Sequence, residues 1–218
     1  MLAGLLSVLL VAGIIGLGIF LATDEPSAAP ATPPASATTS AKQPADQATP
    51  TATSSPEALP PVKIRTLPAA AKAAGCTVTN PPLLSALHDD REFTEADYNS
   101  NPPTSGEHFP QWYEDGIYAP GTTPNLGMLV HTLEHGRIDL QYKPGTPAGT
   151  VNRLESLVDE LDNGYHMLLF ENGTNMPYAV AATAWGHLLG CPAMNDKVFD
   201  AIRAFDKNYV DKGPETVP

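Results

Sequence analysis

The sequence predicts an α+β domain, a small mixed sheet with helices packed on it, and two observations lead to this fold class. From about residue 64 onward the composition becomes that of a globular protein. From residue 137 onward the hydrophobic periodicity changes in the order strand, helix, strand, strand, helix. We expect one transmembrane helix and a disordered linker before this domain, so that the 218 residues divide into 1–22, 23–63 and 64–218.

Residues 1–22 carry no charged side chain. A helix of this length spans roughly 33 Å, which is enough to cross the hydrocarbon core of a bilayer. A cleaved signal peptide is the alternative, although no basic residue precedes the apolar run and Phe20 fits poorly before a cleavage site. Asp24 and Glu25 favour export of the C-terminal side. The sequence therefore predicts an uncleaved signal-anchor and a single-pass membrane protein whose domain lies on the extracytoplasmic side.

The segment 23–63 consists almost entirely of Pro, Ala, Thr and Ser. It cannot bury enough apolar surface to offset the entropy lost on ordering, and its prolines favour extended conformations. We therefore expect a disordered but semi-rigid linker that holds the domain away from the membrane.

The charge of the chain bears on its partners. There are 24 acidic and 12 basic residues, a net charge of −12, and no cluster of Lys and Arg. Because phosphate binding needs clustered positive charge, nucleic acid is excluded as a partner. The expected partners are the membrane, through residues 1–22, and an unidentified protein of the cell envelope.

Three local patterns describe the first part of the domain. Residues 69–74 are rich in Ala and favour a helix, which Gly75 can end. Thr94 can cap a short turn. Residues 98–124 combine many Pro and Gly with aromatic side chains, so we expect an ordered loop on the domain surface.

The second part contains the regular elements. Residues 137–142 alternate apolar and polar side chains, which is typical of a strand. Residues 150–161 place apolar side chains at helical spacing, and Asn163 with Gly164 ends the helix. Asn195 can cap a last amphipathic helix.

Two further apolar segments, 165–170 and 178–185, are separated by the polar turn 171–175. Both segments have the length and the composition of strands. We expect them to pair with each other as a hairpin with a long loop.

The stretch 130–136 concentrates chemistry-bearing side chains, namely His131, Glu134 and His135. In a helix these three share one face, because positions i, i+3 and i+4 are neighbours, and in a strand the two histidines still share a face. Two histidines spaced i, i+4 are a known way of holding Zn²⁺ or Cu²⁺. The stretch therefore predicts a copper or zinc site.

Other side chains could complete such a site. His108 ends a Pro-stiffened loop and is the third candidate ligand, and His88 is a weaker fourth. Met128 could be a soft axial ligand of copper, although a lone Met more often belongs to a core. His166 and His187 stand beside strand ends, and we expect them to be structural. The predicted metal ligands are His88, His108, His131, Glu134 and His135.

Two other functions fit the same residues. The histidines could be hydrogen-bonded structural residues that anchor the aromatic loop, and the domain would then be an interaction module of the cell envelope. Residues 131–135 also satisfy the His-x-x-Glu-His pattern of some zinc-dependent hydrolases, with Glu134 as general base. Gly136 ends that helix at once, and neither Glu155 nor Glu160 on the next predicted helix is marked out as a third ligand. We therefore expect binding rather than catalysis.

Cys76 and Cys191 are the only cysteines. They form no Cys-x-x-Cys pair and an exported compartment is oxidising, so we expect one structural disulfide. The loop that it closes corresponds to about 4 to 5 kcal/mol of stabilisation in the chain-entropy model. A thiol ligand or a redox pair is the alternative.

Three segments, 101–108, 131–136 and 183–186, resemble motifs of the bacterial family known as domain of unknown function 3105. The family commonly has Pro where this chain has Glu107, which adds either an anionic ligand or a surface charge. The resemblance implies an exported, membrane-anchored protein and carries no activity. It covers roughly residues 73–215, with weaker matches at 74–76, His88 and 213–215.

Overall fold

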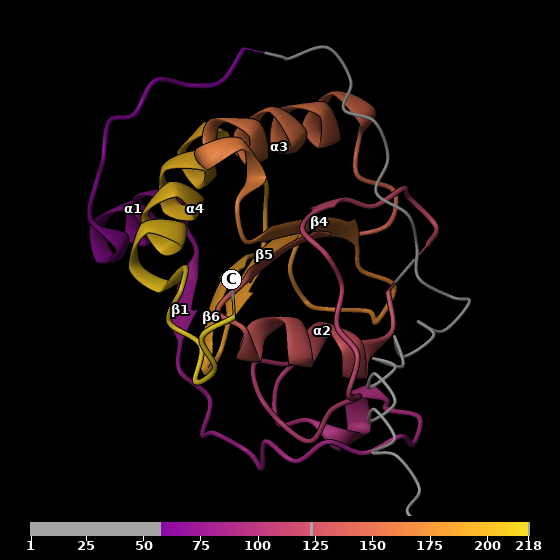
Figure 1. Ribbon diagram of the computed structural model, residues 1–218. Helices are drawn as coiled ribbons and strands as arrows, with labels where there is room; N and C mark the ends of the chain where they lie inside the picture. Colours follow the sequence, from indigo (N-terminus) through magenta and orange to yellow (C-terminus); the bar gives the residue numbers. More distant parts are fainter. Residues whose placement is uncertain (1–57, 123, 218) are drawn as a thin grey trace, which may run out of the picture. The chain divides into compact units, whose positions relative to one another are not determined.

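The computed structural model describes residues 58–122 and 124–217 (Figure 1). The predicted transmembrane helix and most of the predicted linker lie outside these residues. Among the helices of the described part, none combines the length and the apolar character needed to cross a bilayer.

The described residues form one mixed sheet of six strands in the order β1-β6-β5-β3-β4-β2. β3 pairs in parallel with β4 and antiparallel with β5, so it lies inside the sheet. The strands are β1 (Thr77–Thr79), β2 (Gly116–Ile117), β3 (Ile138–Tyr142), β4 (Met167–Glu171), β5 (Val180–Ala184) and β6 (His187–Cys191).

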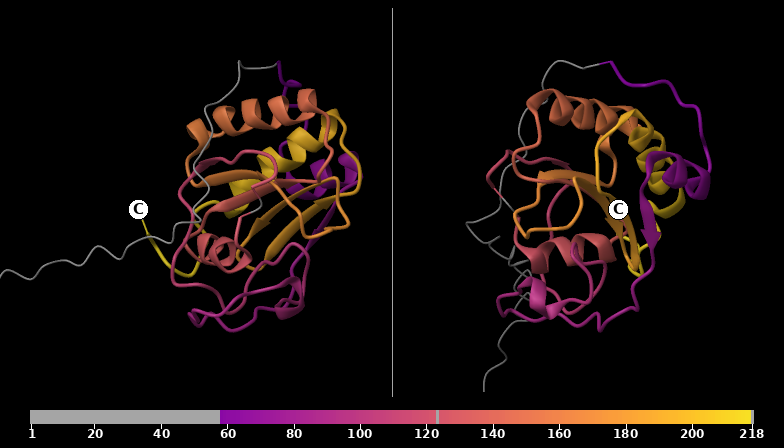
Figure 2. Two further views of the ribbon diagram at one scale, coloured as in Figure 1. Left: turned by 90° about the vertical axis from the view of Figure 1, so that its right-hand side faces the viewer. Right: turned by 180° about the vertical axis from the view of Figure 1, so that it is seen from behind.

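Helices cover both faces of this sheet. Figures 1 and 2 show α1, α3 and α4 on one face and α2 on the other. The four α-helices of the described part are α1 (Leu67–Ala74), α2 (Leu126–Glu134), α3 (Ala148–Glu160) and α4 (Asp196–Tyr209). The expected α+β class, a mixed sheet with helices packed on it, is confirmed.

The alternation of side chains along β4 explains the two layers of core. Met167 and Leu169 belong to the large cluster beneath α1, α3 and α4, whereas Leu168 and Phe170 belong to a second cluster with α2. Successive side chains of a strand point to opposite faces, so a strand that is apolar throughout must be covered on both sides.

Several predicted elements are confirmed with small shifts at their ends. α1 begins two residues before the expected helix and ends at Gly75, which has a left-handed φ of 73°. Thr94 and Asp97 form a capping box on a short 3₁₀ turn. The side chain of Asn195 caps α4 by accepting a hydrogen bond from the backbone N–H of Lys197 at 3.0 Å.

The predicted hairpin between 165–170 and 178–185 is wrong. β4 and β5 are not neighbours, because β3 lies between them in the sheet. β5 instead forms a hairpin with β6, a strand that was not predicted, through the two-residue turn Trp185–Gly186. Gly186 has φ +74°, as such tight turns require. Apolar patterns identify strands but not which strands pair.

The expected surface position of the loop 98–124 is also wrong for its central part. Tyr113 and Tyr118 are almost completely buried and pack with Leu168 and Phe170 of β4. Within the loop β2 pairs with β4 at the edge of the sheet. Tyr113 and Tyr118 therefore belong to the second core and do not lie on the surface.

The disulfide between Cys76 and Cys191 is confirmed, with a Cα–Cα distance of 4.2 Å. It joins the residue before β1 to the last residue of β6, and these two strands are paired. The disulfide therefore links the edge strand β1 covalently to its neighbour β6.

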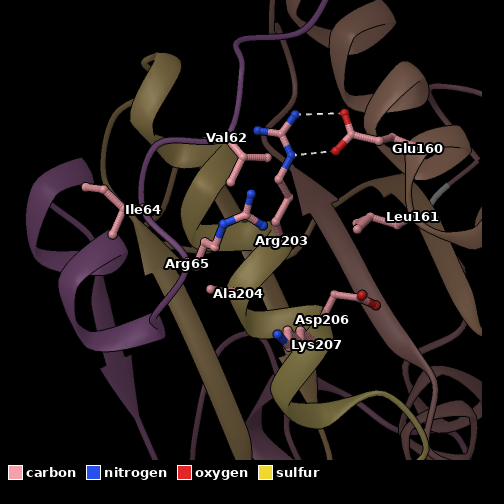
Figure 3. A pocket seen from close by; sticks show the side chains of 9 residues that line it. All are labelled: Val62, Ile64, Arg65, Glu160, Leu161, Arg203, Ala204, Asp206 and Lys207. Carbon is pink, nitrogen blue, oxygen red and sulfur yellow. Dashed lines mark hydrogen bonds and ion pairs between the residues drawn. The ribbon is translucent and has the colours of Figure 1, made fainter.

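The beginning of the described chain is fixed to α4. The carboxylate of Asp200 accepts backbone N–H groups from Lys63 at 3.1 Å and Ile64 at 2.9 Å. Beside it, Arg203 donates two hydrogen bonds to Glu160 of α3, of 2.7 and 2.8 Å. Figure 3 shows this pair at the side of a pocket of about 230 Å³ between α3, α4 and residues 62–65.

Candidate metal centre

α2 carries the central residues of the candidate site. Asn125 caps its start by accepting a hydrogen bond from the backbone N–H of Met128 at 3.2 Å. The helix ends at Glu134, and His135 is the next residue. His131 and Glu134 therefore lie on the last turn of α2, and both side chains are buried.

His108 and His88 reach α2 on two irregular segments that are paired with each other. The backbone N–H of His108 donates to the carbonyl of Leu87 at 3.1 Å, and that of Asp89 donates to the carbonyl of His108 at 2.8 Å. These bonds form a parallel bridge between His88 and His108. The His108 ring donates its Nδ1–H to the carbonyl of Gly106 at 2.8 Å. The two imidazoles are thus brought to the same place.

The orientation of His131 depends on the loop that passes over α2. Its Nδ1 lies 2.8 Å from the carbonyl oxygen of Phe109, which can only accept, so Nδ1 carries the proton. The loop approaches closely because Gly127 has no side chain, and a Cβ there would lie 3.1 Å from the backbone nitrogen of Phe109. The neutral imidazole of His131 therefore keeps its lone pair on Nε2.

Three imidazoles and one carboxylate surround a common point. The ring centroids of His88, His108 and His131 are 4.8, 4.7 and 4.8 Å apart, which is close to an equilateral triangle. Oε2 of Glu134 lies 2.9 Å from Nε2 of His108 and 3.7 Å from Nε2 of His88. One ligand atom from each of the four residues lies within 4.8 Å of the others, and the group could hold a metal ion.

Two of these atoms lack hydrogen-bond partners. Nε2 of His108 and Oε2 of Glu134 are buried and, among the described residues, make no hydrogen bond of acceptable geometry, although they are 2.9 Å apart. Leaving a buried polar atom without a partner costs about 1 to 3 kcal/mol. The tautomer of His108 also leaves an unprotonated nitrogen facing a carboxylate oxygen, and a cation between them would satisfy both.

A second donor group shares His131 with the first. It consists of His131, His135 and Glu215. Nε2 of His135 lies 3.5 Å from Oε2 of Glu215. The backbone N–H of Glu215 donates to the carbonyl of Glu134 at 3.1 Å, which fixes the C-terminal segment against the end of α2.

Burial sets the ionisation of the site. It lowers the pKa of His131 to about 4, against the opposing hydrogen bond to Phe109 and together with the neighbouring histidines. It also lowers the pKa of His135 to about 4, and the charge of Arg137 adds to this effect. Burial raises the pKa of Glu134, while His108 opposes the change. His131 and His135 are therefore neutral at neutral pH, which is the form that binds metals.

Two indole rings contact the imidazoles edge to face. The centroid of Trp112 lies 5.4 Å from that of His131 and 4.7 Å from that of His135. Trp185, from the turn between β5 and β6, lies 6.1 Å from His108. These rings restrict the orientations of the three histidines.

The structure separates the predicted ligands. His88, His108, His131 and Glu134 are brought together, whereas His135 belongs to the second group. The sequence reasoning missed Glu215, and the only signal for it was the weak match of the segment 213–215 to the resembled family.

The other residues considered from the sequence have different contacts. Met128 packs in the second core. Nδ1 of His166 lies 2.7 Å from Oδ1 of Asp211, and Nδ1 of His187 lies 2.7 Å from Oδ1 of Asn80. The remaining two are Glu107, which is 3.5 Å from Arg91, and Glu160, which pairs with Arg203.

Comparison with known proteins places the chain in a family. No curated protein and no solved structure matches it. A family model described as "Protein of unknown function (DUF3105)" matches residues 90–217, which is more than half of the chain and includes both donor groups apart from His88. The chain therefore belongs to the family of proteins of unknown function DUF3105.

Proposed function

We propose that the domain binds one copper or zinc ion through the imidazoles of His88, His108 and His131 and the carboxylate of Glu134. The observation that carries this proposal is the pair of buried, unpartnered atoms, Nε2 of His108 and Oε2 of Glu134, with two further imidazoles beside them. Three nitrogens and one carboxylate oxygen are a common donor set for such ions.

The donor set favours a divalent ion over a cuprous one. Soft sulfur ligands select Cu⁺, whereas imidazole and carboxylate suit Zn²⁺ and Cu²⁺. Both cysteines are in the disulfide, and Met128 lies in the second core. Among the described residues, sulfur therefore takes no part in the donor group.

The two other functions receive less support. Structural histidines alone would leave these two buried atoms without a hydrogen bond of acceptable geometry. A hydrolase would need Glu134 as a free base and a further ligand from the following helix. Glu134 instead lies within the donor group, and Glu160 is on α3, which covers the opposite face of the sheet (Figure 1).

We further propose that the domain acts on the extracytoplasmic side of a membrane, tethered through residues 1–22 and the linker 23–63. The disulfide supports this location, because such bonds persist in oxidising compartments. A protein of the cell envelope would then supply or receive the ion.

The full chain, purified without metal and then exposed to Cu²⁺ or Zn²⁺, should retain one ion per chain after removal of excess. The buried group offers four donors, and His131 has only one nitrogen free for ligation. Mass spectrometry under native conditions measures the stoichiometry. His187→Ala is the control and should retain the ion, because His187 lies outside both donor groups. A wild type that stays metal-free in both solutions would contradict the proposal.

In the metal-free chain, His131 should titrate near pH 4 rather than near 6.5, because burial disfavours its charged form. Since the unfolded chain accepts protons that the folded chain refuses, the metal-free fold should lose stability as the pH falls from about 6.5 towards 4. NMR of the imidazole C–H signals measures the titration, and the chain in urea is the control. A folded-state midpoint near 6.5 would show that the ring is solvated.

A further inference from the structure

His131 belongs to both donor groups but can serve only one ion at a time. Its Nδ1 donates to the carbonyl of Phe109, so only Nε2 has a lone pair for a metal. An ion held by the buried group therefore excludes His131 from an ion held with His135 and Glu215. The two groups describe alternative positions for one ion rather than a site for two ions.

The two positions are close enough for direct passage. The ring centroids of His131 and His135 are 4.5 Å apart, and within each group the ligand atoms lie within 4.8 Å of one another. An ion can therefore exchange His88, His108 and Glu134 for His135, Glu215 and a donor from the pocket while it stays bound to His131. Such stepwise replacement of ligands avoids release of a free ion.

The second position adjoins a pocket, whereas the first is largely enclosed. Three of the four residues of the buried group are almost completely buried, and His88 is the exposed member. The pocket has a volume of about 320 Å³, and it is lined by His135, Tyr165, Asp211, Glu215, Thr216 and Val217. The side chain of Glu215 is 50% exposed there. A chelating group from outside could thus reach an ion beside Glu215.

The C-terminal segment holds Glu215 at this place. Besides the bond from Glu215 to Glu134, the backbone N–H of Asp211 donates to the carbonyl of Gly136 at 2.9 Å. Gly213 lies so close to the end of α2 that a Cβ there would overlap the carbonyl oxygen of Glu134. Nδ1 of His135 is buried and has no hydrogen-bond partner among the described residues. Backbone hydrogen bonds and close packing therefore fix Glu215 beside His135 in the folded chain.

We propose that His131, His135 and Glu215 form a transfer position for a divalent copper or zinc ion, through which the ion passes between the buried group and a chelating ligand in the pocket. This inference rests on the proposed metal binding. It names the route of exchange, and it implies a partner that offers imidazole or carboxylate donors.

The test measures transfer from the full chain, loaded with one equivalent of Cu²⁺, to an excess of EDTA, by stopped-flow absorbance. Glu215→Gln and His135→Gln should each keep one ion per chain, because the buried group is intact, but should slow the transfer by about tenfold. Glu92→Gln is the matched control, since Glu92 is an exposed acid four residues after His88 in the sequence and belongs to neither group. It should transfer as fast as the wild type.

The outcomes separate the two proposals. A wild type that binds no Cu²⁺ would overturn metal binding and the transfer position together. Two variants that hold one ion and transfer it at the wild-type rate would overturn the transfer position alone, since exchange would then pass by way of His88. Two ions per chain at saturation would overturn the exclusive use of His131. Circular dichroism on both variants shows whether each is folded. If Glu215→Gln does not fold, His135→Gln alone decides the question.

Discussion

His131→Ala should weaken Cu²⁺ and Zn²⁺ binding more than any other single substitution, by at least about a hundredfold. It removes the one nitrogen that both donor groups use, so neither position remains complete. His108→Ala leaves the second group intact, and His135→Ala leaves the first. Competition against a chelator of known affinity measures the three dissociation constants.

The comparison between His131→Ala and His135→Ala tests the division of the histidines into two groups. The sequence alone placed both in one site, because they are spaced i, i+4. In the structure, His135 lies beyond the end of α2 and faces Glu215 at 3.5 Å. We expect His135→Ala to retain the ion at equilibrium. Equal loss of affinity in both variants would show that one site uses both histidines.

Replacement of Cys76 and Cys191 together by Ser should lower the free energy of unfolding by about 4 kcal/mol, because the bond closes a long loop of the unfolded chain. Denaturant unfolding of the full chain under non-reducing conditions measures the difference. Unfolding the wild type in the presence of a reductant is the control and should give the same loss.

The cysteines also provide a chemical test. Among the described residues there is no free cysteine, so the native chain should not react with a thiol reagent until it is reduced in denaturant. Two reactive thiols in protein taken from its native compartment, or equal stabilities with and without the bond, would contradict a stabilising disulfide.

Local patterns in the sequence predicted α1, α3 and α4, whereas the stretch that forms the end of α2 was left open between helix and strand. α3 and α4 follow from apolar residues at helical spacing, and Asn195 caps α4 as expected. These elements were predictable because each depends on contacts within a few residues. β3 was predicted as an alternating strand, but both of its faces are buried. Its partners are β4 and β5, which follow later in the chain, and the apolar pattern of a strand does not indicate which strands pair with it.

In the site, too, local proximity could be predicted from the sequence and long-range contacts could not. His131 and Glu134 share one helical turn, so their proximity follows from the spacing once the stretch is a helix. The place of His88 depends on its backbone bridge to His108, and that of Glu215 depends on the C-terminal segment lying against α2. Both arrangements join segments that are far apart in sequence, and only the folded chain reveals them.

The attachment of residues 63 and 64 to Asp200 has a mechanical consequence. Tension applied to the chain from its N-terminal side reaches α4 through these hydrogen bonds. It also follows the chain through α1 to Cys76, and the disulfide passes it on to β6. α2, which carries His131 and Glu134, covers the opposite face of the sheet (Figure 2). A pull from the N-terminal side would therefore first load the layer of α1 and α4, on the face of the sheet opposite α2.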